Sequence, residues 1–178
     1  MKNNAVFLDR DGVLNKAIVR NGKPYPPASL TEFEILPDVK EALLQLKAAG
    51  YLLIVVTNQP DVGRGTQQQS EVEAMHGLLK RELPLDAIYV CYHGYDGECE
   101  CRKPKPGMLI EAAKKYDIDL RQSYIVGDRS KDVDAGLAGG CCTVFIDYGY
   151  CEPLNTLPDF STGTLQNAAK WILQQAPI

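Results

Sequence analysis

The chain has 178 residues, of which 45% are apolar and 24% are charged, and these proportions are typical of a folded domain rather than a disordered chain. Its 19 basic and 23 acidic residues give a net charge of −4, which argues against a nucleic-acid binder that works by general phosphate neutralisation. No apolar run approaches the roughly 20 residues of a membrane span, and no secretion signal is recognisable. We therefore expect a cytoplasmic monomer with no membrane and no nucleic-acid partner.

Short apolar runs alternate with longer amphipathic segments along the chain, and no linker or repeat interrupts them. The expected strands are residues 5–8, 51–56, 87–91, 123–126 and 142–146. The expected helices are residues 37–49, 67–82, 106–116, 131–138 and 165–175. Strands that alternate with helices in this way predict one α/β domain over residues 1–178, with a doubly wound, mostly parallel sheet.

Polar clusters follow the first four expected strands. They are Asp9–Asp11, Thr57–Gln59, Cys91–Lys103 and Asp128–Asp132. In open parallel sheets, ligands bind outside the carboxyl ends of the strands, which meet at one edge. We therefore expect the four clusters to converge on a single site.

Asp9 and Asp11 allow three interpretations: a solvated turn, a bare metal site, or a nucleophile with a neighbouring acid/base. Their spacing places both side chains on the same face of an extended chain. Asp128 adds a third carboxylate at the same edge, and three converging carboxylates repel one another strongly in the absence of a cation. Because Mg²⁺ prefers oxygen ligands of this kind, the pattern favours a Mg²⁺ site.

Thr57 and Lys103 supply groups that a metal site alone does not need. Taken singly, a threonine at a strand end usually caps a turn, and a lysine is usually solvated. Together, a hydroxyl and an ammonium beside Mg²⁺ form a receptor for the oxygens of a phosphoryl group in transfer. The combination therefore indicates phosphoryl-transfer chemistry.

Cys91, His93, Cys99 and Cys101 place four metal-binding side chains within eleven positions. A Cys₃His set is typical of a structural, tetrahedral Zn²⁺ site, and clustered cysteines in a reducing compartment more often bind metal than form disulfides. The alternative is a set of reduced surface cysteines beside a free histidine. The intervening residues cannot form a core of their own, which favours Zn²⁺ as a staple for the zinc loop, at about residues 91–103.

The sequence resembles the haloacid dehalogenase-like (HAD) phosphatases over essentially its whole length. Four segments carry the resemblance: Asp9-x-Asp11-Gly12-Val13, Thr57-Asn58, Lys103-Pro104 and Gly127-Asp128-x-x-x-Asp132. The resemblance implies that Asp9 is the nucleophile that forms an aspartyl-phosphate and that Asp11 is the general acid/base. It also implies that Asp9, the main-chain carbonyl of Asp11 and Asp128 hold Mg²⁺. Thr57 and Lys103 would then bind the phosphoryl oxygens, while the role of Asp132 stays open between positioning Lys103 and positioning a metal-bound water.

The zinc loop before Lys103 narrows the resemblance to small HAD phosphatases with a minimal cap. These include heptose bisphosphate phosphatases and histidinol-phosphate phosphatases. Asn58-Gln59 and Val62-x-Arg64-Gly65 resemble the first group, whereas the short spacer of the zinc loop and Gly127-Asp128-Arg129 resemble the second. The resemblance implies a small sugar-phosphate substrate, with heptose 1,7-bisphosphate converted to the 1-phosphate, and histidinol phosphate as the alternative.

The same resemblance implies substrate-binding roles for four residues: Asn58, Gln59, Arg102 and Arg129. Residues at about 12–30, rich in Gly, Pro and polar side chains from Asn15 onward, are expected to form a flap over the active edge. This segment is too short for a cap domain. Specificity should therefore come from the flap and the zinc loop.

Two other classes of function compete with this interpretation. A phospho-acceptor signalling domain uses a similar Asp, Thr and Lys set, but Asp11 would supply an acid/base that hydrolyses its own phosphorylated form. A zinc interaction module leaves the carboxylates without a purpose. Cys141 and Cys142 are expected to be small buried residues, and Cys151 has no assigned role. His76 is expected to face solvent or to pack locally on its helix.

Overall fold

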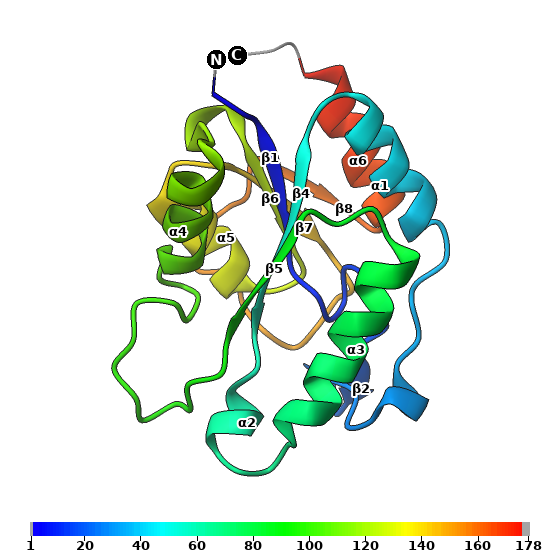
Figure 1. Ribbon diagram of the computed structural model, residues 1–178, viewed down its shortest axis with the longest axis vertical. Helices are drawn as coiled ribbons and strands as arrows, with labels where there is room; N and C mark the ends of the chain where they lie inside the picture. Colours follow the sequence, from blue (N-terminus) through cyan, green and yellow to red (C-terminus); the bar gives the residue numbers. More distant parts are fainter. Residues whose placement is uncertain (1, 176–178) are drawn as a thin grey trace.

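The computed structural model describes residues 2–175. The predicted domain over residues 1–178 thus includes Met1 and residues 176–178, which lie outside the described residues. A six-stranded sheet forms the centre of the molecule, with strand order β5-β4-β1-β6-β7-β8 (Figure 1). Each neighbouring pair in this sheet is parallel, which confirms the predicted doubly wound α/β architecture.

The strands form where short runs of apolar residues have no polar alternation, as expected for strands covered on both faces. β1 (Ala5–Leu8) is fully buried and lies between β4 (Leu52–Asn58) and β6 (Tyr124–Gly127). The sheet continues with β5 (Ala87–Cys91) on one side and β7 (Cys142–Ile146) and β8 (Phe160–Thr162) on the other. The central position of β1 places its carboxyl end in the middle of the functional edge.

Helices cover both faces of the sheet, and side chains of β1 alternate between two cores. Val6 and Leu8 belong to a core with α1 (Val39–Ala48), α3 (Gln69–Glu82) and α6 (Leu165–Gln174). Ala5 and Phe7 face the opposite core, which includes α4 (Gly107–Tyr116). Figure 1 shows α5 (Ser130–Gly139) beside α4, on the side of the sheet opposite α1 and α6.

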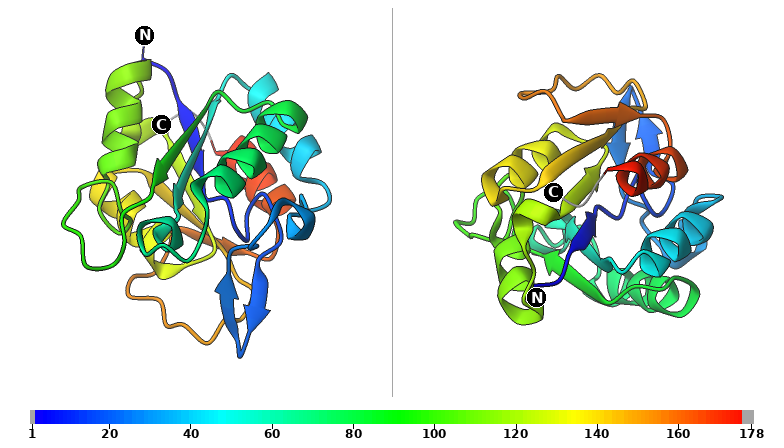
Figure 2. Two further views of the ribbon diagram at one scale, coloured as in Figure 1. Left: turned by 60° about the horizontal axis from the view of Figure 1, so that its bottom comes forward. Right: turned by 90° about the horizontal axis from the view of Figure 1, so that it is seen from above.

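The flap contains regular structure that the sequence analysis does not predict. Residues 18–25 form an antiparallel hairpin of β2 (Ile18–Arg20) and β3 (Lys23–Tyr25). The hairpin projects from the functional edge of the sheet, beside the loop between β7 and β8 (Figure 2, left). The Cys151 main-chain N–H donates to the carbonyl of Gly22 over 2.9 Å. A Cβ on Gly22 would lie 2.5 Å from Sγ of Cys151, so the hairpin packs closely on that loop.

Three short elements complete the chain: α2 (Pro60–Gly63) and the 3₁₀ helices η1 (Leu30–Glu32) and η2 (Leu120–Gln122). α2 packs on the zinc loop, because a Cβ on Gly63 would lie 2.3 Å from the main-chain oxygen of Tyr92. Among residues 2–175, no helix has both the length and the apolar character needed to cross a bilayer.

Candidate active site

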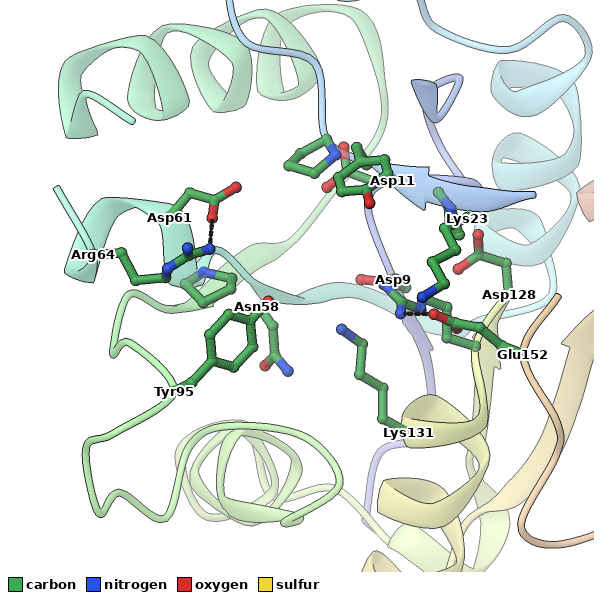
Figure 3. Close-up of a pocket in the computed structure, with 15 residues that line it drawn as sticks. Asp9, Asp11, Lys23, Asn58, Asp61, Arg64, Tyr95, Asp128, Lys131 and Glu152 are labelled. Atoms are coloured by element: carbon green, nitrogen blue, oxygen red, sulfur yellow. Dashed lines mark hydrogen bonds and ion pairs between the residues drawn. The ribbon is translucent and has the colours of Figure 1, made fainter. Parts of the chain in front are cut away.

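The polar clusters after β1, β4 and β6 converge at one edge of the sheet, as predicted. They border a cavity of about 470 Å³ that also receives residues from the flap, α2, the zinc loop and the loop after β7 (Figure 3). The lining residues that bear on the chemistry are Asp9, Asp11, Asn58, Asp128, Arg129 and Lys131. The central strands β1, β4 and β6 therefore run from the hydrophobic core to the cavity, and the polar residues at their carboxyl ends line it.

Asp9 follows β1 directly, and its main-chain N–H donates to the carbonyl of Val126 in β6. The Nζ atom of Lys103 lies 2.9 Å from Oδ1 of Asp9 and 2.6 Å from Oδ1 of Asp132. Burial lowers the pKa of Lys103, but the charges of Asp132 and Asp9 more than compensate and raise it above its ordinary value. Lys103 is therefore a permanent ammonium that joins two carboxylates.

Asp128 completes a cluster of carboxylates with Asp9 and Asp132, whose nearest oxygens lie within 4.8 Å of one another. Burial and the negative charges of Asp9 and Asp132 raise the pKa of Asp128 well above its ordinary value. Burial and the Asp132 charge also raise the pKa of Asp9, although Lys103 opposes this shift. Each ionised carboxylate in the cluster thus raises the pKa of its neighbours and favours their protonated form.

The cluster fits a divalent cation. Both carboxylate oxygens of Asp128 are buried and have no hydrogen-bond partner among the described residues. Three carboxylates and one ammonium leave a deficit of two positive charges, which one divalent ion matches. Gly12 allows this arrangement, because it has φ +84° and a Cβ there would lie 1.9 Å from Oδ2 of Asp128.

Asp11 has a different environment from Asp9, although only one residue separates them. Oδ1 of Asp11 accepts from Arg10 Nη2 and from Asn15 Nδ2, each over 2.9 Å, and Oδ2 accepts from Gln59 Nε2 over 2.9 Å. Burial raises the pKa of Asp11, whereas the Arg10 charge and the hydrogen bond from Asn15 lower it. With the Arg10 and Gln59 hydrogen bonds added, the pKa lies below its ordinary value. The Asp11 carboxylate is thus oriented and ionised, and it lies outside the carboxylate cluster.

Arg10 is completely buried and connects Asp11 to α3. Its Nη1 atom lies 3.3 Å from Nε2 of His76, which must accept because a guanidinium only donates. Burial and the positive charge of Arg10 lower the pKa of His76 to about 4. His76 is only 6% exposed, so it packs inside the molecule and does not face solvent.

Thr57 and Asn58 end β4, and their partners explain their positions. The Thr57 hydroxyl oxygen accepts from Gln59 Nε2 over 2.9 Å. The Asn58 side chain exchanges two hydrogen bonds with the main chain of Lys103, which fixes the residue that carries the ammonium. Asn58 also lines the cavity, whereas Gln59 is buried and bonded to Thr57 and Asp11. The structure therefore places Gln59 behind the predicted site rather than on its wall.

Arg129 and Lys131 lie at the start of α5. Arg129 lines the cavity as expected, but its guanidinium is bonded to the carboxylate of Glu152 through both Nε and Nη2. Lys131 is a cavity residue that the sequence analysis does not single out. Burial and the nearby Arg129 charge lower the pKa of Lys131.

Arg102, which is expected to contribute to substrate binding, is bonded within the zinc loop. Its guanidinium donates to the main-chain carbonyls of Gly94, Tyr95 and Gly97, all in the zinc loop. It also lies 5.9 Å from the centre of the Tyr95 ring. Arg102 thus holds the loop in shape and is absent from the residues that line the cavity.

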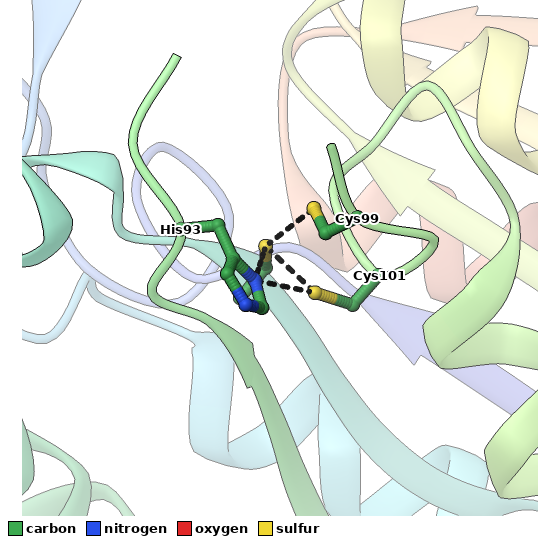
Figure 4. A group of neighbouring side chains, drawn as sticks. His93, Cys99 and Cys101 are labelled. Carbon is green, nitrogen blue, oxygen red and sulfur yellow. Dashed lines mark hydrogen bonds between the residues drawn. The ribbon is translucent and has the colours of Figure 1, made fainter. Parts of the chain in front are cut away.

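The four predicted zinc-binding side chains lie together at the carboxyl end of β5 (Figure 4). Sγ of Cys91 lies 3.7 Å from Sγ of Cys99 and 3.5 Å from Nδ1 of His93. Cys101 closes the group, with Sγ 2.8 Å from Cys91 Sγ and 3.2 Å from His93 Nδ1. A tetrahedron with zinc–sulfur bonds of about 2.3 Å has sulfur–sulfur edges of about 3.8 Å. The Cys91–Cys99 edge matches this value, whereas the Cys91–Cys101 edge is shorter and would have to widen around the ion. The donor set and its clustering fit a structural zinc ion.

This chain is similar to known proteins in both sequence and fold. A HAD-hydrolase-like family model matches residues 100–166. D-glycero-beta-D-manno-heptose-1,7-bisphosphate 7-phosphatase from Salmonella typhi is 37% identical over 95% of this chain and 89% of that protein. The chain belongs to the HAD-like phosphatases.

Further relatives agree with this membership. The protein of the same name from Pasteurella multocida is 42% identical over 74% of each chain. The solved structure of D,D-heptose 1,7-bisphosphate phosphatase from B. bronchiseptica, complexed with magnesium and phosphate, superposes with a TM-score of 0.79. It is 31% identical and is matched over 97% of this chain and 99% of that chain. This HAD member is therefore a phosphatase, which excludes the signalling and zinc-module interpretations.

Sequence reasoning assigns no site role to Arg10, Lys23, His76, Lys131 or Glu152, which lie in or beside the site. Arg10 stands between the two predicted catalytic aspartates, and that position was the available signal. Glu152 and His76 are remote from the motifs in sequence, and only the tertiary structure brings them to Arg129 and Arg10.

Proposed function

We propose that this HAD phosphatase is Mg²⁺-dependent and hydrolyses a small phosphate monoester through an aspartyl-phosphate on Asp9. The observation that carries the proposal is the buried cluster of Asp9, Asp128 and Asp132 beside Lys103, of which Asp9 and Asp128 line the cavity. It has the charge and the oxygen donors for a divalent ion, and it opens to a space that admits a small ester. The magnesium in the B. bronchiseptica structure supports this choice of ion.

We assign D-glycero-β-D-manno-heptose 1,7-bisphosphate as the substrate, with loss of the 7-phosphate. The support is the name shared by the relatives from S. typhi and P. multocida, together with their coverage of this chain. A sugar bisphosphate also suits a cavity whose walls carry several cationic side chains. The open cavity is bordered by the flap and α2, with no separate cap domain among residues 2–175.

Asp9 and Asp128 would hold Mg²⁺ through carboxylate oxygens and Asp11 through its main-chain carbonyl, because the Asp11 side chain is engaged elsewhere. When bound, the ion neutralises charge on the phosphoryl oxygens and keeps Asp9 ionised. Lys103 and the Thr57 hydroxyl bind the remaining phosphoryl oxygens, with Lys103 already poised beside Asp9. Asp132 positions Lys103 through their ion pair.

Two proton transfers at Asp11 complete the reaction. Because Asp11 is ionised in the free protein, it must first take up a proton from solvent when substrate binds. A carboxylate oxygen of Asp9 then bonds to phosphorus while the bond to the ester oxygen breaks, and the protonated Asp11 donates its proton to that leaving oxygen. A water molecule then attacks the phosphorus of the aspartyl-phosphate and transfers its proton to Asp11. Phosphate leaves, and Asp9 returns to its carboxylate form. The hydrogen bonds from Asn15 and Gln59 orient the Asp11 oxygens for both steps.

The Cys₃His group would hold Zn²⁺ and stabilise the loop that delivers Lys103. Cys91 pairs with Asn58 in the sheet register, and Asn58 binds the Lys103 main chain. A zinc ion at this point would therefore fix the position of a phosphoryl-binding residue without touching substrate.

The test is phosphate release from both anomers of the heptose bisphosphate and from histidinol phosphate, with and without Mg²⁺. We expect Mg²⁺-dependent turnover, a preference for the β anomer and one phosphate released per sugar, with the 1-phosphate as the product by ³¹P NMR. A clear preference for histidinol phosphate would overturn the substrate assignment and leave the chemistry intact. Full activity in the presence of excess metal chelator would overturn the metal assignment.

A further inference from the structure

Four cationic side chains line the cavity, and they divide into two kinds. Arg64 pairs with Asp61 and Arg129 pairs with Glu152. Lys23 and Lys131 form no ion pair with any residue in the range 2–175. The lysines, unlike the arginines, therefore lack a direct carboxylate partner, although Asp9, Asp11 and Asp128 also line the cavity.

The two lysines come from different walls of the cavity. Lys23 belongs to β3 in the flap hairpin, and Lys131 belongs to the first turn of α5. In Figure 3 both side chains extend toward the open space in front of Asp9. Two ammonium groups that face one cavity repel each other, and an anion between them removes that cost.

We propose that Lys23 and Lys131 bind a second anionic group of the substrate, separate from the phosphoryl group that is transferred. This inference rests on the proposed function and names the residues for the part of the substrate that is not transferred, a further phosphate or carboxylate. The proposed function already assigns Lys103, Thr57 and the cation of the carboxylate cluster to the transferred phosphoryl group. The cavity of about 470 Å³ leaves room beyond that group.

The pairing of the arginines strengthens this assignment. Glu152 neutralises Arg129, and Asp61 neutralises Arg64, so neither arginine offers a free charge without giving up a carboxylate partner. Lysine ammonium groups bind anions as point charges from several directions, which suits a flexible flap and a fixed helix acting together. The predicted role of Arg129 in substrate binding is therefore transferred here to Lys131.

The test compares substrates that share the scissile group and differ in the second anion. The first pair is heptose 1,7-bisphosphate and heptose 7-phosphate, and the second is 3-phosphoglycerate and glycerol 3-phosphate. For the wild type we expect a lower KM for the member with two anionic groups in at least one pair. Which pair shows the preference distinguishes a phosphate from a carboxylate as the second anion.

Lys131→Met and Lys23→Met should each reduce that preference by about tenfold, mainly through KM, because each variant loses one charge-assisted contact to the second anion. Lys131→Gln provides a second variant at the half-buried position. The matched control is Lys114→Met, an exposed lysine of α4, which should retain the wild-type preference. The inhibition constant of heptose 1-phosphate provides a binding readout that does not depend on turnover.

Equal KM values for both members of each pair in the wild type would overturn the proposal. So would lysine variants that lose activity equally on both members. Failure of the heptose assignment is distinguishable, because the enzyme would then leave heptose esters intact. The same comparison would then be made with fructose 1,6-bisphosphate and fructose 6-phosphate, and loss of the preference in the lysine variants would still support the second-anion site.

Discussion

The Nζ atom of Lys103 lies 2.9 Å from Oδ1 of Asp9, and the ammonium is completely buried. A cation fixed beside the nucleophile lowers the repulsion between an anionic carboxylate and an anionic phosphoryl group. It also stabilises the protein, because it compensates two carboxylates that have little access to water.

Lys103→Met should therefore affect both stability and turnover. Removing one partner of a buried ion pair typically costs about 3–5 kcal/mol, so we expect a clear loss of unfolding free energy in urea. Phosphate release should fall by at least about a hundredfold. Lys105→Met is the matched control, because Lys105 is exposed and pairs only with Glu100. A Lys103→Met protein with wild-type turnover would contradict the assigned role.

Asp9→Asn and Asp11→Asn should fail at different steps with p-nitrophenyl phosphate, whose leaving group needs no proton. Asp9→Asn lacks the nucleophile and should release no p-nitrophenol while keeping its fold, as measured by circular dichroism. Asp11→Asn should give a burst of about one p-nitrophenol per chain and then turn over slowly, because the aspartyl-phosphate lacks its base. Rapid-quench kinetics measures the burst, and near-normal turnover by Asp9→Asn would exclude covalent catalysis.

Gly12→Ala should weaken the metal site. Its Cβ would lie 1.9 Å from Oδ2 of Asp128, so the carboxylate must move. Gly50→Ala is the control, because Gly50 also has positive φ (+92°) but has nothing within 4 Å of its Cβ position. Both variants should lose roughly 1–2 kcal/mol of stability from backbone strain. Only Gly12→Ala should raise the Mg²⁺ concentration needed for half-maximal activity. We expect an increase of about tenfold or more, because displacement of the Asp128 carboxylate weakens one ligand of the ion.

His76 should make stability depend on pH. Its pKa in the folded protein is about 4, below the ordinary value of 6.5, because burial and Arg10 disfavour its charged form. The unfolded chain binds the proton first, so stability should rise as pH increases from about 4 to 6.5 and level off above that. His76→Gln should remove this part of the dependence, which urea unfolding at pH 5 and pH 7.5 measures. An identical pH profile in the variant would show that other groups cause it.

Removal of zinc should loosen the zinc loop before it affects the sheet. Metal analysis should find about one Zn per chain under the tetrahedral-site interpretation. Cys99→Ser should lower the metal content and raise hydrogen exchange in residues 92–103, whereas Cys151→Ser, at an exposed cysteine outside the cluster, should change neither. A metal-free protein in which residues 92–103 remain ordered and protected from exchange would contradict a structural role for zinc.

The central strands are predictable within two residues because unbroken apolar runs between polar clusters are a strong local signal. The convergence of the catalytic side chains is predictable for the same reason, since parallel strands bring their carboxyl ends to one edge. The hairpin of β2 and β3 and the strand β8 are each short and partly exposed, so they have no apolar run to mark them.

The partners of charged side chains are harder to predict than their positions. Arg102 and Arg129 belong to segments that border the site, yet one guanidinium binds loop carbonyls and the other binds Glu152. Long flexible side chains can reach several partners, and the nearest acceptor in space decides the outcome. The position of Lys131 on the cavity wall is not predictable from the sequence, because a lysine at a helix start is ordinarily solvated.

The position of β1 between β4 and β6 also determines when, during synthesis, the chain first becomes an enzyme. Asp9 is among the first residues made, but Asp128 and Asp132 belong to the last third of the sequence. A nascent chain that ends before residue 128 has a nucleophile but lacks one of the carboxylates proposed to hold the cation. Onset of phosphatase activity during translation would thus report that β4 and β6 have both paired with β1.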